Sequence, residues 1–149
     1  MEHIRFYNEK DKPDSREKER IAEFLFQHLE QYGDAKDDIK RAVAYALKEI
    51  ESFGGFVIVY EKEGQIAGTV VVNRTGMKGY IPENILVYIA THRKFRGKGI
   101  GKRLMQETVS KAQGSIALHV EEDNPARFLY EKVGFDKKYL EMRYLKRGE

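Results

Sequence analysis

The chain contains the stretch Arg96-Gly97-Lys98-Gly99-Ile100-Gly101-Lys102-Arg103, in which glycines alternate with mostly basic residues. An apolar run at 85–90 precedes it, and apolar residues with helical spacing, including Leu104 and Met105, follow it. This pattern predicts a glycine-rich turn between a buried strand and a helix. Backbone N–H groups at such a helix N-terminus bind phosphate. Cations in the first turn oppose the helix dipole at about 0.3–1 kcal/mol each, so the basic residues favour an anion-binding site.

The best-known phosphate loops do not match this stretch. A P-loop needs a glycine five residues before Gly-Lys and a Ser or Thr after it, but His92 and Arg96 occupy the two glycine positions. The dinucleotide fingerprint fails because Leu104 occupies its third glycine position. The sequence therefore predicts a pyrophosphate site of another kind, and the alternative is a glycine-rich turn with a solvated basic patch.

Length and composition restrict the class of protein. The 149 residues predict a single domain, 1–149. The absence of cysteine excludes disulfides, thiolate zinc sites and cysteine nucleophiles, and we expect no metal. We find no secretory signal pattern and no apolar run of the roughly 18 residues that cross a membrane, so we expect a cytoplasmic protein without a membrane partner. The net charge of +3 is too small to indicate nucleic acid.

The remaining patterns predict an α+β fold. In the first half of the chain we expect a strand at 3–7, a helix opened by a capping box at 14–17 and ended by Gly33, and a second helix from Ile39 past Ile50 to 54–55. Strands at 56–60 and 66–73, joined by a turn at 63–64, and a loop at 74–83 should follow. After the glycine turn and its helix we expect a strand at 115–120, a short helix and a β pair at 135–145. The strand–helix–strand unit at 85–120 should be right-handed and parallel. The hairpins make the rest antiparallel. The result is a mixed, mostly antiparallel central sheet flanked by helices.

A second motif lies in the predicted short helix. Asn124 is a good N-cap, and Pro125 suits the first helical position. Gly134 suits the position that follows the helix. Tyr130 falls on the inward face, where a tyrosine is more often a core residue than a catalytic one.

Together the two motifs resemble those of the GNAT superfamily (GCN5-related N-acetyltransferases). The first is Arg96-x-x-Gly99-x-Gly101, preceded by Ile89-Ala90-Thr91. The second is Asn124-Pro125-Ala126, followed by Leu129-Tyr130-Glu131-Lys132-x-Gly134-Phe135. The resemblance covers about a third of the chain and implies the acyl-CoA N-acyltransferase fold, with strands 85–91 and 115–120 splayed apart.

The resemblance also implies an activity and a set of site residues. The protein would transfer an acetyl group from acetyl-CoA to a primary amine by direct attack in a ternary complex. Tyr130 would donate a proton to the leaving sulfur. The coenzyme would contact the backbone near two strand residues, the amides of the glycine turn, its basic side chains and one asparagine; these residues are Ile89, Thr91, Arg96, Gly97, Lys98, Gly99, Gly101, Lys102 and Asn124.

The general base is less well determined than the acid. Some relatives carry a glutamate in the strand before the glycine turn, but here that position is Ile85. We take Glu83, two residues earlier, as the candidate base because alternate strand residues share a face. The rival candidates are Glu121, Glu122 and His119. For each carboxylate the alternative is a solvated surface group.

The acceptor is expected to be a small-molecule or peptide amine. In the superfamily the first two helices, their connection and the loop before the coenzyme strand shape its site; here these carry Tyr32, Asp34, Asp37, Asp38, Tyr45, Tyr80 and Glu83. Acidic and aromatic groups suit a cation, although Asp34 to Asp38 also suit a helix N-terminus. Two other classes remain open, a non-catalytic acyl-CoA sensor and, with much less support, a nucleic-acid-binding module. We expect a monomer or a homodimer.

Overall fold

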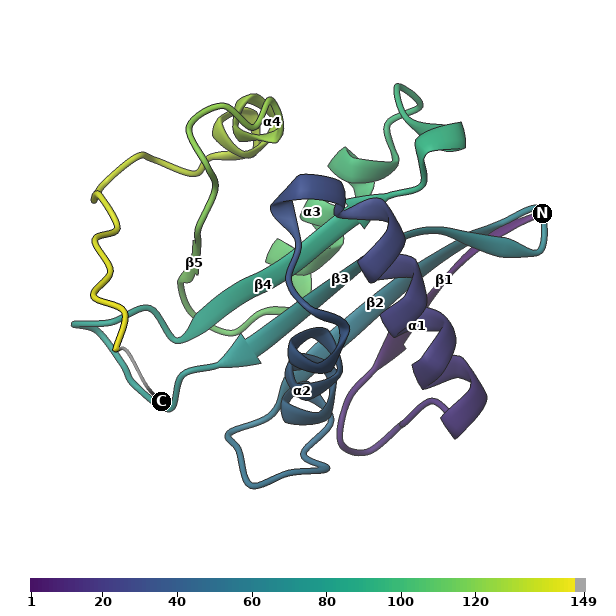
Figure 1. Cartoon of the computed structure of the whole chain (residues 1–149), viewed down its shortest axis with the longest axis horizontal. Helices are drawn as coiled ribbons and strands as arrows, with labels where there is room; N and C mark the ends of the chain where they lie inside the picture. Colours follow the sequence, from purple (N-terminus) through teal and green to yellow (C-terminus); the bar gives the residue numbers. More distant parts are fainter. Residues whose placement is uncertain (147–149) are drawn as a thin grey trace.

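The computed structural model describes residues 1–146 and contains one sheet with helices on both faces (Figure 1). Its elements are β1 (Glu2–Tyr7), α1 (Ser15–His28), the 3-10 helix η1 (Glu30–Tyr32), α2 (Lys36–Ala46), β2 (Gly55–Lys62), β3 (Gln65–Arg74), β4 (Asn84–Thr91), the 3-10 helix η2 (Arg93–Phe95), α3 (Ile100–Lys111), β5 (Ile116–Leu118) and α4 (Ala126–Val133). No helix in this part of the chain is long and apolar enough to span a bilayer.

The sheet order is β1-β2-β3-β4-β5. The first four strands pair antiparallel, and β4 pairs with β5 in parallel. The predicted mixed, mostly antiparallel sheet is therefore confirmed. The predicted strand at 115–120 is shorter than expected, because only Ile116–Leu118 form a strand.

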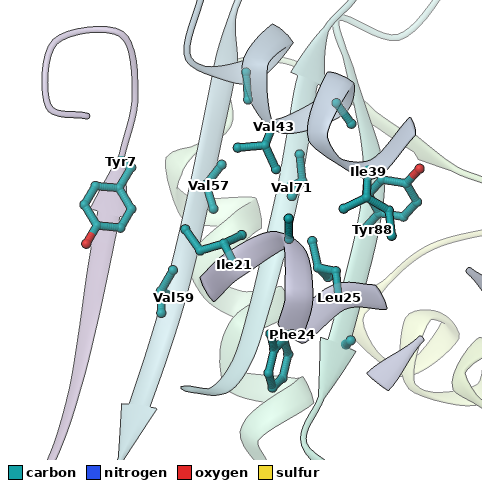
Figure 2. Packing of buried hydrophobic residues seen from close by; sticks show 14 of the residues in the cluster. Tyr7, Ile21, Phe24, Leu25, Ile39, Val43, Val57, Val59, Val71 and Tyr88 are labelled. Atoms are coloured by element: carbon teal, nitrogen blue, oxygen red, sulfur yellow. The ribbon is translucent and has the colours of Figure 1, made fainter. Parts of the chain in front are cut away.

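Side-chain alternation along the strands divides the core into two layers. One layer joins α1 and α2 to the sheet through residues such as Ile21, Leu25 and Val71 (Figure 2). The other layer joins α3 and α4 to the opposite face. In β3, a Cβ at Gly68 would come within 2.7 Å of Leu104 Cδ1, so the absence of a side chain lets α3 approach the sheet closely.

The first predicted helix begins as expected and the second ends early. The Asp14 side chain accepts a hydrogen bond from the Glu17 N–H, as the capping box requires. The prediction that the second helix continues past Ile50 is wrong, because α2 ends at Ala46 and Ile50 is 43% exposed. Lys48 adopts a left-handed conformation, φ 56°, and the Glu49 N–H donates to the Ala44 carbonyl, 2.9 Å, so the chain leaves the helix here. The Ser52 hydroxyl also donates to the Tyr45 carbonyl, 2.7 Å.

The predicted β pair at 135–145 is wrong. Residues 135–146 form no strand in the structure, although their apolar residues suit one. Tyr139, Leu140 and Met142 are 85–91% exposed. A strand needs a partner as well as suitable residues, and none of the described residues pairs with this segment.

Candidate active site

The pairing between β4 and β5 ends halfway along β4. The two strands share a register only at Asn84, Ile85 and Leu86, and β5 then gives way to a segment that leads away to α4 (Figure 1). Within residues 1–146, no strand pairs with this edge of β4 from Val87 to Thr91. We call this the unpaired edge of β4. It leaves backbone N–H and C=O groups free for a ligand.

A β-bulge decides which backbone groups face the unpaired edge. The Asn84 N–H donates to the Ser115 carbonyl, on the β5 side, whereas the His92 N–H donates to the Ala67 carbonyl, on the β3 side. Residues separated by an even number should point to the same side of a regular strand. The β3–β4 register shifts opposite Val71 and Val72, and the shift leaves Val87 as an inserted residue.

The inserted residue reverses the orientation of everything after it. Since His92 faces β3, Ala90 and Tyr88 also direct their backbone groups to β3. Ile89 and Thr91 therefore direct theirs toward the unpaired edge. These are the two strand residues that the motif comparison selected for coenzyme contacts. No local pattern in the sequence predicts the bulge itself.

The segment Arg96–Gly101, which we call the glycine loop, leads from η2 into α3. Gly97 and Gly99 adopt left-handed conformations, φ 80° and 82°, which glycine adopts without steric cost. In the part of the chain described, no hydrogen bond uses a backbone N–H between Gly97 and Lys102. The first turn of α3 holds no acidic residue. Together these features are those that suit an anion at a helix N-terminus.

The basic residues of this region have different surroundings. Arg103 pairs with Glu107 within α3, 3.3 Å. Lys98 and Lys102 form no ion pair with any described residue, so their charges stay uncompensated next to the positive end of the helix dipole. A bound polyanion would turn this repulsion into attraction.

Arg96 fixes the glycine loop to α1. Its guanidinium donates to the carbonyls of Thr91 and His28, 3.3 and 3.2 Å, and lies 3.7 Å from a Glu30 carboxylate oxygen. Its backbone N–H already donates to the Arg93 carbonyl. Arg96 therefore positions the loop, and the free amides begin one residue later than the motif alone suggested.

Gly101 serves helix packing as well as the loop. A Cβ at this position would lie 3.1 Å from Leu129 Cδ2 and 3.7 Å from Thr91 Oγ1. The start of α3, the side of α4 and the end of β4 thus meet at Gly101. Any larger residue here must displace Leu129.

Asn124 and Tyr130, the two motif residues near α4, have different positions: Asn124 lies at the start of the helix, and Tyr130 points into the core. The Asn124 Oδ1 accepts from the Ala126 N–H, 2.9 Å, and so caps α4. Tyr130 is 8% exposed and packs in the α3 layer near Phe135. Burial raises the pKa of the Tyr130 hydroxyl to about 12. No hydrogen bond of the described residues uses this hydroxyl.

Glu83 lies apart from the other predicted site residues. It immediately precedes the paired end of β4, and its two carboxylate oxygens accept from the N–H groups of Ser115, 2.6 Å, and Gly79, 2.9 Å. These hydrogen bonds lower the pKa of Glu83. Such a carboxylate is fixed and weakly basic, so the geometry lends no support to Glu83 as the base. The rivals His119, Glu121 and Glu122 are exposed in the segment between β5 and α4.

A pair of histidines adjoins the glycine loop, and sequence reasoning missed it. His28, at the end of α1, stacks on His92 with 4.3 Å between ring centroids. The His28 Nδ1 is buried without a hydrogen-bond partner in the described chain. Burial, followed by His92, Arg96 and Arg93, lowers the pKa of His28. Single histidines 64 positions apart carry no local pattern that reveals such a contact.

Comparison with known proteins identifies the family. Residues 53–137 match the family model of the acetyltransferase (GNAT) domain. Because the match spans more than half of the chain, the protein belongs to the GNAT acetyltransferase family. The family and the fold predicted from the two motifs are confirmed.

Individual relatives share no more than about a third of their residues with the chain in the aligned regions. The 5-NmdU N-acetyltransferase of Pseudomonas phage PaMx11 is 30% identical over 83 residues, which span 54% of this chain and 57% of that protein. The chain thus matches little more than half the length of that relative. Among solved structures, PH1933 from Pyrococcus horikoshii OT3 is 25% identical with a TM-score of 0.69, covering 94% of this chain and 93% of that one.

An aminoglycoside N-acetyltransferase, AAC(6')-Iy in complex with CoA, has a TM-score of 0.71 over 99% of this chain and 95% of its own. Its sequence identity is 17%. A second structure of that enzyme holds a bisubstrate analogue, CoA-S-monomethyl-acetylneamine, with a TM-score of 0.68 over 99% of each chain and 16% identity. At these identities the likeness shows the shared fold.

Proposed function

We propose that residues 1–149 form one N-acetyltransferase domain that transfers an acetyl group from acetyl-CoA to a primary amine. The observation that carries this proposal is the continuity of two unsatisfied backbone surfaces. The unpaired edge of β4 runs through Ile89 and Thr91, and the free amides from Gly97 to Lys102 begin a few residues later. A pantetheine arm needs the first surface and a pyrophosphate needs the second.

The residues fit the co-substrate chemically. Backbone groups of Ile89 and Thr91 would bind the pantetheine amides, and the glycine-loop amides would bind the pyrophosphate. Lys98 and Lys102 would compensate its charge, since neither has a partner among the described residues. The Asn124 Oδ1 is occupied by its capping bond, so its side-chain N–H groups would serve the coenzyme. The complexes with CoA and with a CoA bisubstrate analogue formed by proteins of the same fold support this role.

The reaction follows from the groups present. The amine nitrogen attacks the thioester carbonyl, a C–N bond forms, the C–S bond breaks, and the proton lost by nitrogen balances the thiolate that leaves. A lysine-like amine costs about 4.6 kcal/mol to deprotonate at pH 7. Direct transfer is favoured because the chain contains no cysteine to form a thioester intermediate. Tyr130 would donate a hydrogen bond to the leaving sulfur.

The acceptor is proposed to be a small-molecule or peptide amine. The names of the relatives support this class, since one acts on 5-NmdU and another on aminoglycosides. Initial-rate kinetics test the mechanism: intersecting lines indicate a ternary complex, and parallel lines would contradict direct transfer.

Thermal unfolding with acetyl-CoA tests the coenzyme site. At an acetyl-CoA concentration of about a hundred times the Kd, binding adds about 2.7 kcal/mol to the free energy of unfolding. This raises the Tm of a domain of this size by about 5–10 °C. ATP and NAD serve as control ligands. No rise with acetyl-CoA would remove the basis of the proposal. A rise without amine-dependent release of thiol would favour an acyl-CoA sensor instead.

A matched pair of variants locates the binding. Gly99→Asp introduces bulk and negative charge into the glycine loop. Gly64→Asp is its control, because Gly64 in the β2–β3 turn has a similar φ, 76° against 82°, and a Cβ added at either glycine would meet no atom within 4 Å. Both variants should lose similar stability, about 1 kcal/mol from backbone strain. We expect only Gly99→Asp to lose the rise in Tm with acetyl-CoA.

A further inference from the structure

An exposed carboxylate is held by a buried tyrosine near the unpaired edge of β4. Asp34 lies in the connection between η1 and α2, and one of its oxygens accepts from the Tyr88 hydroxyl, 2.5 Å. Tyr88 belongs to β4 and is 7% exposed, whereas Asp34 is exposed. The other Asp34 oxygen forms no hydrogen bond or ion pair with residues 1–146. Its charge is therefore fixed in place and available.

The connection that carries Asp34 bridges β4 and the segment after β5. It passes in front of β4, between the end of α1 and α2 (Figure 1). The Tyr32 hydroxyl donates to the Asp123 carbonyl, 3.5 Å, in the segment between β5 and α4. Asp34 is two residues from Tyr32, and Tyr88 adjoins Ile89, whose backbone faces the unpaired edge. The carboxylate is thus on the α1–α2 side of the place where the thioester would lie.

Helix capping does not explain Asp34. The N-cap of α2 is Ala35, and no side chain caps this helix. Asp37 and Asp38 already supply the acidic residues of its first turn, which favour the helix dipole. Asp37 and Asp38 therefore already provide the favourable interaction with the helix dipole that a charge at Asp34 could supply.

The two sides of the unpaired edge carry opposite charge. The glycine-loop side has the uncompensated Lys98 and Lys102, which suit the anionic coenzyme. The opposite side has Asp34 and the exposed carboxylates that follow β5, and the pKa of Tyr32 is raised by burial and then by Asp123 and Glu121. The nearest cation of α2, Lys36, is engaged by Glu19 and Glu23.

We propose that Asp34, positioned by Tyr88, binds a second positive charge on the acceptor, so that the enzyme acetylates one amine of a dicationic substrate. This inference rests on the proposed acetyltransferase function. It names the substrate class: an amine with another ammonium group several bonds away. Putrescine is the probe, and butylamine, which lacks the second charge, is the matched control substrate. A short lysine-containing peptide distinguishes a peptide source of the same chemistry.

The test compares Asp34→Asn with Glu51→Gln. The asparagine keeps an acceptor for Tyr88 and removes the charge. Glu51, in the loop between α2 and β2, is an exposed carboxylate without an ion pair in the described chain. Loss of one charge-assisted contact should raise KM for putrescine about tenfold in Asp34→Asn, with KM for butylamine and kcat for both unchanged. Glu51→Gln should change neither KM nor kcat for either amine. Tyr88→Phe should raise the KM for putrescine with little effect on kcat, since it frees the carboxylate without removing it.

Calorimetric binding separates this inference from the proposed function. Putrescine is titrated into the wild-type protein saturated with CoA, and into Asp34→Asn, whose fold is checked by its Tm. Binding that weakens about tenfold in Asp34→Asn supports Asp34 as the site of the second positive charge, and if no turnover accompanies it, the acetyltransferase proposal is what fails. Equal effects of Asp34→Asn on putrescine and butylamine, or no effect on either, would overturn the inference.

Discussion

Replacement of Tyr130 by phenylalanine tests the chemistry of the site most directly. The substitution removes one hydroxyl from a side chain that is 8% exposed and otherwise packed among apolar residues. No described residue shares a hydrogen bond with that hydroxyl, so its removal leaves no unpaired partner. We therefore expect the Tm of Tyr130→Phe to stay within about 2 °C of the wild type.

The pKa of Tyr130 sets the size of the kinetic effect. Burial raises it to about 12, whereas the thiol reference pKa is about 8.5. Full transfer of the phenol proton to a thiolate is then uphill by roughly 5 kcal/mol. In the proposed mechanism Tyr130 would therefore donate a hydrogen bond to the developing negative charge and keep its proton. A hydrogen bond to a charged group contributes about 1.5–3 kcal/mol, which corresponds to about a 10- to 150-fold loss of kcat in Tyr130→Phe.

Release of CoA thiol, followed with a thiol reagent at saturating acetyl-CoA and amine, measures this loss. KM for acetyl-CoA should change less than about twofold, because the hydroxyl contributes only as sulfur becomes negative. Tyr7→Phe is the matched control, since Tyr7 is equally buried but lies on β1, across the sheet. An unchanged kcat would refute the role of Tyr130, and a loss above about 10⁴-fold would refute hydrogen bonding in favour of obligatory proton transfer.

Two further predictions concern stability. The pKa of His28 lies below its ordinary value of 6.5, so the unfolded chain binds the His28 proton more tightly than the folded chain does. The free energy of unfolding should therefore fall as the pH decreases from about 7.5 to 5.5. Urea midpoints measured over this range should show the slope, which His28→Gln should reduce and the exposed-site control His119→Gln should not. Ending the chain at Lys137 should leave the Tm within about 2 °C, because the apolar residues of the removed segment are 76–91% exposed; a larger fall would show that this segment packs on the domain.

The fold could be predicted wherever local pattern and tertiary packing agree. The runs of β-branched residues in β2 and β3, the Glu63-Gly64 turn and the Asp14 cap all specify their structures locally. Prediction failed where a partner decides the outcome. Ile50 continues a helical spacing, yet the helix ends earlier, where Lys48 is left-handed and the Glu49 N–H bonds the Ala44 carbonyl. The apolar residues after Phe135 suit a strand, but a strand requires an edge to pair with.

The same distinction between local pattern and tertiary contact applies to the candidate site. The glycine turn before α3 and the inward position of Tyr130 could be predicted from the sequence, because a turn and a helix face are local patterns. Their exact tasks could not be predicted: Arg96 turned out to hold the loop through carbonyls of two other elements, and Gly101 to accommodate Leu129. Strand alternation predicts Glu83 as the base, but it contains no information on the N–H groups of Gly79 and Ser115, which donate to the Glu83 carboxylate in the folded chain.

The inserted residue of β4 connects both halves of the proposed site. Without the bulge at Val87, Tyr88 would share a face with Leu86, which packs toward α3. With it, Tyr88 packs toward α1 and α2, where its hydroxyl reaches Asp34. The same insertion turns the backbone of Ile89 to the unpaired edge. One extra residue therefore directs a side chain to the acceptor side and the next backbone group to the coenzyme side, so the two proposed binding functions have a common structural origin.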